Sequence, residues 1–276
     1  MPVRSAYGLH IRGLDGVTEL TATAYPPAGS RPVTVRQRDT EAPEPVPLDA
    51  DRVVRPLTDG RTLELDRRLR TATFYGPPLD PAVLAHPYLA PVAVICNRWA
   101  GRETFHAGAF GLDGRAWVVP GGRTAGKSSL LAALAARGVP VLTDDIAVLD
   151  GDQVLAGPRC VDLREPVPGV ALPTRGVRDG SRLRIALPAG PHRLPLGGWL
   201  FLRWGDGPAL TPLGPTELLA RLAALRSLPE LPSDATRLLG LAGVPAYELT
   251  RPRDWTALDA THRLLTATLT PVGAAR

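Results

Sequence analysis

Short stretches of alternating or clustered apolar residues dominate the first eighty positions. They lie at 7–11, 19–24, 32–36, 62–65 and 70–75, are rich in β-branched and aromatic residues, and are separated by turn residues. Such segments are typical of β-strands. We therefore expect a small β-rich region here, either an accessory domain or an extension of a main sheet.

The pattern becomes helical between residues 79 and 99, with Pro81 near the start and Pro91 inside the segment. We expect one or two helices, kinked or divided at Pro91, because a proline inside a helix removes a hydrogen bond and clashes with the preceding turn. Together these patterns predict a β-rich N-terminal accessory region, 1–100, that ends in helices, and a second domain, 101–276.

Strand patterns and amphipathic helix patterns alternate from residue 104 onward. Strands are expected at 105–110, 115–119, 139–143, 147–149, 199–203 and 246–249, and helices at 128–137, 215–226, 234–239 and 254–269. The span 159–186 is rich in proline, glycine and arginine and is expected to be a loop. This order of elements predicts an α/β fold.

Composition and charge exclude one class of partner. The chain has 276 residues, 21% of them charged and 44% apolar, as in an ordinary globular protein that can bury a substantial core. Its net charge of +5 comes from arginines scattered along the chain, and no nucleic-acid-binding signature accompanies them. We therefore expect no nucleic-acid partner.

Cysteine use and hydropathy point to the cytoplasm. Cys96 and Cys160 have neither the number of a disulfide framework nor zinc-ligand spacing, and both are expected to be buried thiols. The first residues lack the apolar segment of a signal peptide. The longest apolar stretch, 84–96, is broken by prolines and is too short to span a bilayer. We expect a cytoplasmic protein without a membrane partner, which could form a homo-oligomer.

The chain contains a single lysine, Lys127, although Lys and Arg together number 32. This lysine belongs to a phosphate-binding motif of the type G-x-x-x-x-G-K-[ST]. In such a motif, backbone N–H groups surround nucleotide phosphates, the lysine reaches the β- and γ-phosphates, and the next hydroxyl binds Mg²⁺. A planar guanidinium would not replace the compact ammonium in so tight a loop. The motif G-x-x-x-x-G-K-[ST] consists here of Gly121, Gly122, Arg123, Thr124, Ala125, Gly126, Lys127 and Ser128.

The neighbours of the motif decide between a nucleotide site and a glycine-rich turn that matches by chance. An apolar strand pattern at 115–119 leads into the loop, and a helical pattern at 128–137 follows it. Strand, loop and helix are the context that the motif requires, and a helix N-terminus adds partial positive charge near the phosphates. We predict that residues 121–129 bind ATP and Mg²⁺, with Ser128 as a metal ligand and Ser129 in the first helical turn. Nothing in the sequence distinguishes ATP from GTP.

Two aspartates follow the strand pattern at 139–143. Ligands of open α/β sheets lie outside the carboxyl ends of strands, so Asp144 and Asp145 would lie near the γ-phosphate if that strand neighbours the loop strand. Adjacent residues on a continuing strand point to opposite faces, so both carboxylates reach the site only at a turn. One could then bind Mg²⁺ and the other accept a proton. The alternative is a solvated turn or a helix cap.

The order of three segments resembles the catalytic domain of the HPr serine kinase/phosphorylase family. These are the histidine strand 105–109, the loop 121–128 and the strand 141–145 that ends in the aspartate pair. The similarity is nearest to the stand-alone kinases found beside ribosomal peptide biosynthesis genes, including lasso peptide kinases. It implies a mixed sheet with flanking helices, like that of HPr kinases and PEP carboxykinases.

The resemblance also implies roles for single residues. It places His106, which alone would more often be structural, in the active site, and makes Asp144 the proton acceptor. It puts Asp145 and Ser128 near Mg²⁺, although the division of roles between the two aspartates stays open. Arg164 falls where these kinases carry an Ile-Arg-Gly segment and could contact phosphate or substrate. No glycine follows Arg164, and the N-terminal part does not match the regulatory domain of full-length HPr kinases, so HPr itself is not favoured as substrate.

Four further arginines lie in the span 159–186, namely Arg175, Arg178, Arg182 and Arg184. They could belong to a mobile lid in which one or two arginines stabilise charge on the transferred phosphoryl group. Arg182 and Arg184 are preferred, because they precede an apolar segment. The alternative is a solvated basic loop.

Three functions are consistent with these patterns. The first is an ATP–Mg²⁺-dependent serine/threonine kinase, with a small ribosomal natural-product peptide as the favoured acceptor. The second keeps this chemistry and replaces the peptide by a free amino acid or another small hydroxyl metabolite. The third is a nucleotide-binding scaffold that transfers no phosphate, and the aspartate pair argues against it because a pure binding site needs no base.

Overall fold

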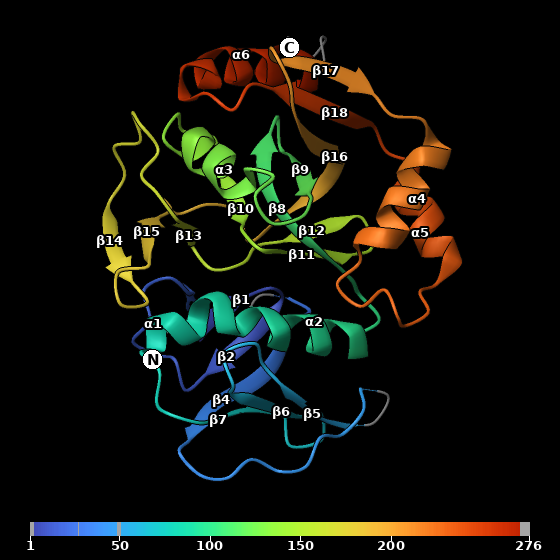
Figure 1. The fold of residues 1–276 in the computed structure, drawn as a ribbon. Coiled ribbons are helices and arrows are strands. Elements are labelled where there is room, and N and C mark those ends of the chain that lie inside the picture. Colours follow the sequence, from blue (N-terminus) through green and yellow to red (C-terminus); the bar gives the residue numbers. More distant parts are fainter. Residues whose placement is uncertain (1–2, 27, 49–50, 271–276) are drawn as a thin grey trace. The chain divides into compact units, whose positions relative to one another are not determined.

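The protein, seen here in a computed structural model, divides into two compact units, Met1–Gly101 and Arg102–Arg276 (Figure 1). The structure describes residues 3–26, 28–48 and 51–270. The sequence-based boundary lies between residues 100 and 101, one residue from this division. Among the described residues, no helix is both long and apolar enough to cross a membrane.

A seven-stranded mixed sheet forms the first unit, in the order β3-β1-β2-β4-β7-β6-β5. Alternate residues of its strands are buried, such as Leu9 and Ile11 on β2 and Leu63 and Leu65 on β6. The predicted strands are confirmed, whereas β1 and β5 were not predicted. The strands are β1 (Val3–Ala6), β2 (Leu9–Arg12), β3 (Thr21–Thr23), β4 (Arg31–Arg38), β5 (Arg52–Pro56), β6 (Thr62–Asp66) and β7 (Thr71–Tyr75).

The helical segment of this unit is divided, but not where the sequence predicted. It consists of α1 (Pro81–Val83), a π-helical turn η1 (Leu84–Tyr88) and α2 (Leu89–Trp99). The break lies at His86, whose φ of −156° and ψ of 119° are extended, because the following Pro87 disfavours a helical conformation there. Pro91 lies in the first turn of α2, where a backbone N–H has no acceptor within the helix, so the N–H that proline lacks costs no hydrogen bond. The predicted division at Pro91 is therefore wrong.

The second unit is built on an eight-stranded mixed sheet in the order β10-β8-β11-β12-β16-β18-β17, with β9 paired to both β8 and β16. β16 runs parallel to β9 and to β18, so these three strands end at the same edge of the sheet. The strands are β8 (Glu103–Leu112), β9 (Arg115–Pro120), β10 (Val141–Thr143), β11 (Ile146–Asp150), β12 (Gln153–Leu155), β16 (Arg193–Trp204), β17 (Ala209–Pro212) and β18 (Ala246–Arg251). Of these, β12 and β17 were not predicted.

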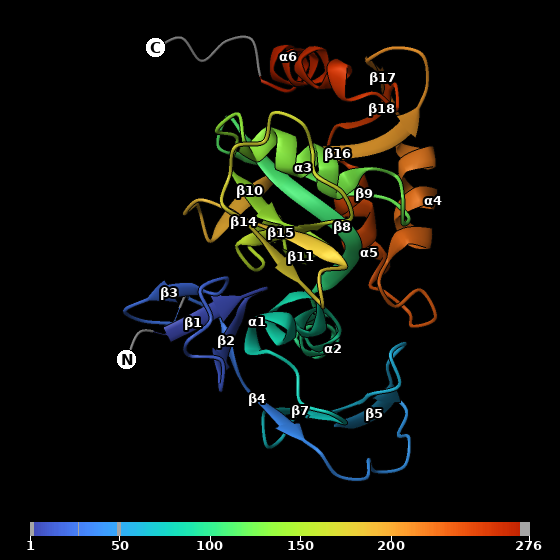
Figure 2. The same cartoon turned by 60° about the vertical axis from the view of Figure 1, so that its left-hand side comes forward.

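Different helices cover the two faces of this sheet (Figure 2). Trp117 and Val119 of β9 pack in one apolar cluster with residues of α3 (Lys127–Ala135) and α6 (Leu258–Leu269). Val118, between them, packs on the other face with residues of α4 (Pro215–Leu225) and α5 (Ala235–Ala242). The short helix η2 (Trp255–Ala257) precedes α6. The predicted α/β class, with helices on both sides of a mixed sheet, agrees with this arrangement.

The span 159–186 is a small sheet and not the predicted loop. Its strands β13 (Cys160–Leu163), β15 (Arg182–Ala186) and β14 (Thr174–Val177) are antiparallel neighbours in that order. Val161, Leu163 and Ile185 are buried in the same cluster as α3. Prolines and glycines occupy the connections between these strands, and their high frequency concealed the short apolar alternation.

The close approach of β16 to its neighbours gives a stability prediction. A methyl group at Gly198 would overlap the carbonyl oxygen of Pro245 and come within 2.5 Å of the Trp117 ring. Gly198→Ala should therefore lower the free energy of unfolding by about 1–3 kcal/mol, the usual effect of overpacking. Urea denaturation followed by tryptophan fluorescence measures it.

Gly240→Ala is the matched control, because a Cβ at Gly240 on α5 meets no atom within 4 Å. Its stability should be unchanged or slightly higher, since alanine favours the helix. Equal destabilisation by both substitutions would contradict the packing argument.

Candidate functional site

The segment 121–128, here called the glycine loop, joins the end of β9 to the start of α3. Gly121, Thr124 and Gly126 have φ angles of 154°, 69° and 82°, in the region that favours glycine. Gly126 is the residue that precedes the first turn of α3, and Ser129 lies in that turn, as predicted. Strand, loop and helix therefore follow one another in the order that the motif requires.

Lys127 is folded inward, with only 7% of its surface exposed. Its ammonium donates hydrogen bonds to the carbonyl oxygens of Gly121 at 2.6 Å and Gly122 at 3.0 Å. Burial lowers the pKa of Lys127, whereas the carboxylates of Asp144 and Asp145 raise it. The only ammonium side chain of the protein thus lies inside the curve of the glycine loop.

His106 lies beside this ammonium, on β8. Its Nε2 atom is 3.4 Å from Nζ of Lys127, and its carbonyl oxygen accepts a hydrogen bond from the N–H of Gly121 at 3.4 Å. Burial and the Lys127 ammonium lower the pKa of His106, against an opposing effect of Asp145. The imidazole therefore lies against the Lys127 ammonium, in surroundings that disfavour its protonation.

The aspartate pair occupies a bend between β10 and β11, and both of these strands pair with β8. Asp145 has a φ of 68°, and its carbonyl oxygen accepts a hydrogen bond from Ala107 of β8 at 3.0 Å. This bend supplies the turn that two adjacent carboxylates need to reach one site. β8 separates β10 from β9, so the strand that carries the pair is not the neighbour of the loop strand.

The carboxylate of Asp144 nevertheless reaches the glycine loop. Ser128 donates a hydrogen bond from Oγ to Oδ1 of Asp144 at 3.1 Å, and only 2% of the Asp144 surface is exposed. Burial and the neighbouring Asp145 carboxylate raise the pKa of Asp144 to about 8, although Ser128 and Lys127 act in the opposite direction. The buried Asp144 and Lys127 and the half-buried Ser128 therefore form one cluster that presents a carboxylate, an ammonium and a hydroxyl group.

This cluster fits a magnesium nucleotide by the chemistry of its donors. A hydroxyl and carboxylates are the hard oxygen ligands that Mg²⁺ takes. Ser128 and Asp144 supply two of them 3.1 Å apart, and Asp145 is the next residue of the chain. An ammonium and the start of a helix are the groups that stabilise phosphate. The remaining predicted loop residues include Arg123 and Thr124, which are exposed.

The predicted arginines do not gather at this cluster. Arg164 is exposed, directly after β13, and among the described residues it makes no hydrogen bond to the glycine loop. Arg184 is 1% exposed and donates from Nε and Nη2 to the two carboxylate oxygens of Asp162, at 2.7 and 2.9 Å. Arg178 approaches the same carboxylate at 3.4 Å. The preference for Arg184 as a mobile lid residue is therefore wrong, because a bidentate partner on the adjacent strand fixes its side chain.

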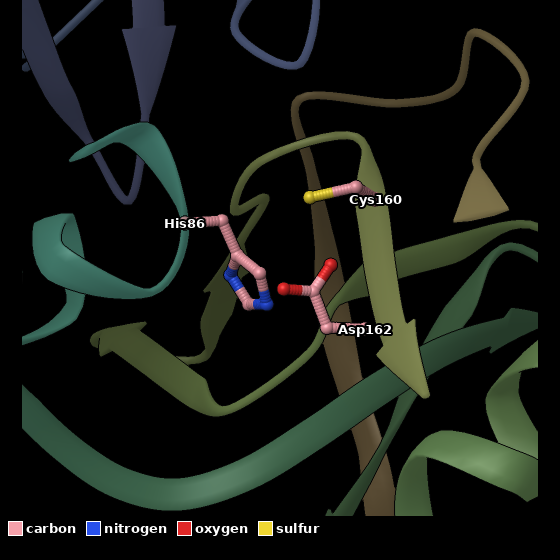
Figure 3. Close-up of side chains that lie close together, drawn as sticks. All are labelled: His86, Cys160 and Asp162. Carbon is pink, nitrogen blue, oxygen red and sulfur yellow. The ribbon is translucent and has the colours of Figure 1, made fainter. Parts of the chain in front are cut away.

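Asp162 and Cys160 lie on the same side of β13, two residues apart (Figure 3). Cys160 is buried, as predicted, whereas the side chain of Cys96 is only partly buried. Burial raises the pKa of Cys96 to about 12, so this thiol is unreactive.

Two residues that the sequence did not single out also contact the glycine loop. Nη2 of Arg251 donates to the carbonyl oxygens of Ala125 at 3.3 Å and Gly126 at 2.9 Å, and the guanidinium lies 4.4 Å from the centre of the Trp204 ring. Trp204 ends β16 and Arg251 ends β18. Their place at the carboxyl ends of two predicted strands was the signal that could have identified them.

No protein-family model matches the chain, and no curated protein matches it significantly. Among solved structures, the chain is similar to the HPr(Ser) kinase/phosphatase from Coxiella burnetii, at 16% sequence identity and a TM-score of 0.31. The similarity covers 60% of this chain and 99% of that one. It is a distant similarity of fold.

Proposed function

We propose that the protein is an ATP–Mg²⁺-dependent kinase that transfers the γ-phosphoryl group to a serine or threonine hydroxyl, with a small peptide as the acceptor. The observation that carries this proposal is the 3.1 Å contact between Ser128 of the glycine loop and Asp144 of the aspartate pair. It joins a phosphate-binding motif to a pair of carboxylates, which are the parts that phosphoryl transfer needs.

The phosphates would be bound by the backbone N–H groups of the glycine loop and by Lys127. The ammonium already lies within the loop, bonded to two carbonyl oxygens, so it needs little movement to bind β- and γ-phosphate oxygens. The first turn of α3 adds partial positive charge. These groups orient the γ-phosphoryl group and stabilise charge that develops on it.

Ser128 Oγ and the Asp145 carboxylate would hold Mg²⁺. When bound there, Mg²⁺ supplies positive charge that neutralises the β- and γ-phosphate oxygens. His106 lies beside this site, with its Nε2 atom 3.4 Å from the ammonium nitrogen of Lys127, which would bind the phosphates. Burial and the Lys127 ammonium lower the pKa of His106.

Asp144 would accept the proton of the attacking hydroxyl. The hydroxyl oxygen forms a bond to the γ-phosphorus, the bond to the oxygen that bridges the β- and γ-phosphates breaks, and ADP leaves with that oxygen. The hydroxyl proton passes to Asp144. Asp144 can accept the proton only in its ionised form. Burial opposes this form, and the positive charge of a bound Mg²⁺ would favour it.

The acceptor class rests on the resemblance of 105–109, 121–128 and 141–145 to peptide serine kinases. Incubation with γ-labelled ATP and either a serine-containing peptide or free serine tests it directly. Label on the peptide supports the proposal, and label on free serine alone would move the function to a small-metabolite kinase. ATP bound intact, with no transfer to either acceptor, would leave a nucleotide-binding scaffold.

Removal of the ammonium should abolish transfer. Lys127→Ala loses a charge-assisted hydrogen bond to the phosphates, so the affinity for MgATP should fall roughly 10- to 100-fold. Titration calorimetry measures the affinity, and a thermal unfolding curve checks that the variant folds. Lys127→Arg should also fail, because the planar fork does not fit the loop. Unchanged nucleotide affinity in Lys127→Ala would refute the proposed phosphate site.

Asp144→Asn should separate chemistry from binding. The amide keeps the shape of the carboxylate but cannot accept the proton, so the transfer rate should fall at least about 100-fold while MgATP affinity changes little. Asp145→Asn should instead weaken the binding of MgATP. The control is Asp152→Asn, in the exposed turn between β11 and β12, which should leave both unchanged. If Asp144→Asn weakened MgATP binding and Asp145→Asn slowed the transfer, the roles proposed for the two aspartates would be exchanged.

The raised pKa of Asp144 also predicts how stability depends on pH. Between the ordinary aspartate pKa of 3.8 and the raised pKa of about 8, the folded protein holds a proton that the unfolded chain releases. Stability therefore falls as pH rises through this window. In the absence of metal and nucleotide, Asp144→Asn should remove this slope and raise stability near pH 8, by about 0.5–2 kcal/mol. Urea denaturation at several pH values measures it. Parallel slopes in the variant and the unaltered protein would contradict the raised pKa of the buried Asp144 carboxyl.

A further inference from the structure

The carboxyl ends of three parallel strands meet at the glycine loop. β9 leads into the loop, β16 ends at Trp204 and β18 ends at Arg251, and these last two residues are partners in the parallel register (Figure 1). Ligands of α/β sheets bind outside the carboxyl ends of parallel strands. Trp204 and Arg251 therefore lie on the edge of the sheet where a nucleotide bound to the loop would lie.

Arg251 is a buried cation without a carboxylate. It is 4% exposed, and among the described residues it forms no ion pair and its Nε has no hydrogen-bond partner. Burial lowers its pKa to about 10. Burial of a guanidinium without a carboxylate partner carries a desolvation cost. The two hydrogen bonds from Arg251 to the glycine loop are its polar contacts in this position.

Those two hydrogen bonds orient the loop. In a trans peptide the C=O of one residue and the N–H of the next point in opposite directions. Because Arg251 binds the carbonyl oxygens of Ala125 and Gly126, the N–H groups of Gly126 and Lys127 point away from it. These are the N–H groups that would face the phosphates. Arg251 therefore holds the loop on the side opposite to its phosphate-binding face.

Trp204 has one face occupied and a substantial part of its surface open. The Arg251 guanidinium lies over its ring at 4.4 Å, yet 38% of the residue is exposed, which is unusual for so large an apolar side chain. The edge of the ring touches the loop, since a Cβ at Gly126 would lie 2.8 Å from its Cη2 atom. An open aromatic surface thus borders the glycine loop where α3 begins.

We propose that Trp204 is the platform on which the nucleobase stacks, and that Arg251 is the positioning residue that holds this ring and the glycine loop together. The inference rests on the proposed function, because it assumes that phosphates occupy the loop. Stacking does not read the hydrogen-bonding edges of a base. The site should therefore accept both adenine and guanine nucleotides.

Calorimetric titration with MgATP, MgGTP and magnesium tripolyphosphate tests this inference. Tripolyphosphate carries the phosphates without a base. Trp204→Ala should weaken both nucleotides roughly tenfold and leave tripolyphosphate within about twofold. Trp204→Phe, which retains an aromatic face, should recover most of the nucleotide affinity. In the unaltered protein, MgATP should change the tryptophan emission and tripolyphosphate should not, and Trp204→Phe should lose this change.

Arg251 should give a different pattern. Arg251→Met should weaken all three ligands to a similar extent, because the loop loses its support, and Arg251→Lys should restore part of that affinity.

Two results would overturn the platform. One is equal weakening of nucleotide and tripolyphosphate by Trp204→Ala, which would make Trp204 a support of the loop only. The other is unchanged nucleotide affinity in that variant. Failure of the unaltered protein to bind any of the three ligands would instead overturn the proposed function, and the platform with it.

Discussion

The candidate site depends on the backbone pairing of β8 with strands on both of its edges. On one edge β8 pairs with β9, which leads into the glycine loop, and on the other it pairs with β10 and β11, which flank the aspartate pair. Two adjacent residues of β8 bind the two halves directly. The carbonyl of His106 accepts from Gly121, and the N–H of Ala107 donates to Asp145. Gly108, next along β8, leaves room for Leu131 of α3, which allows the helix to lie close to the sheet.

Burial sets the electrostatics of this cluster. Lys127 and Asp144 are both more than nine-tenths buried. Burial lowers the pKa of Lys127 and raises the pKa of Asp144, which favours the neutral form of each. Each also stabilises the charge of the other. Perturbed titratable groups of opposite sign beside a helix N-terminus are typical of functional sites. In the proposed function, a metal and a triphosphate would supply the charges that this cluster lacks.

Two buried arginines show how the same residue type is used in opposite ways. Arg184 has a carboxylate partner, Asp162, that satisfies it in bidentate geometry on an adjacent strand, so its role is to join β13 and β15. Arg251 has carbonyl oxygens and an aromatic ring as its partners. Both are arginines in a protein with a single lysine, and composition alone could not separate them.

The sequence alone determined those features that depend on local spacing. The glycines at fixed intervals before Lys127, the apolar strand before them and the helical pattern after them defined the loop, because positive φ angles and helix periodicity are properties of neighbouring residues. The adjacency of Asp144 and Asp145 at a strand end likewise indicated a turn. The break at His86 was missed although the following Pro87 is a local signal for it, and the strands within 159–186 were missed because prolines and glycines concealed their short apolar alternation.

Only the tertiary structure decided which distant residues meet. That β8 lies between β9 and β10, that Ser128 contacts Asp144 and that Arg184 is bound by Asp162 all follow from strand order and register. Trp204 and Arg251 are 47 residues apart in the sequence and carry no motif, yet a parallel pairing makes them direct partners beside Gly126. Strand order is fixed by burial of two sheet faces under different helices, which is a property of the whole unit and not of any segment.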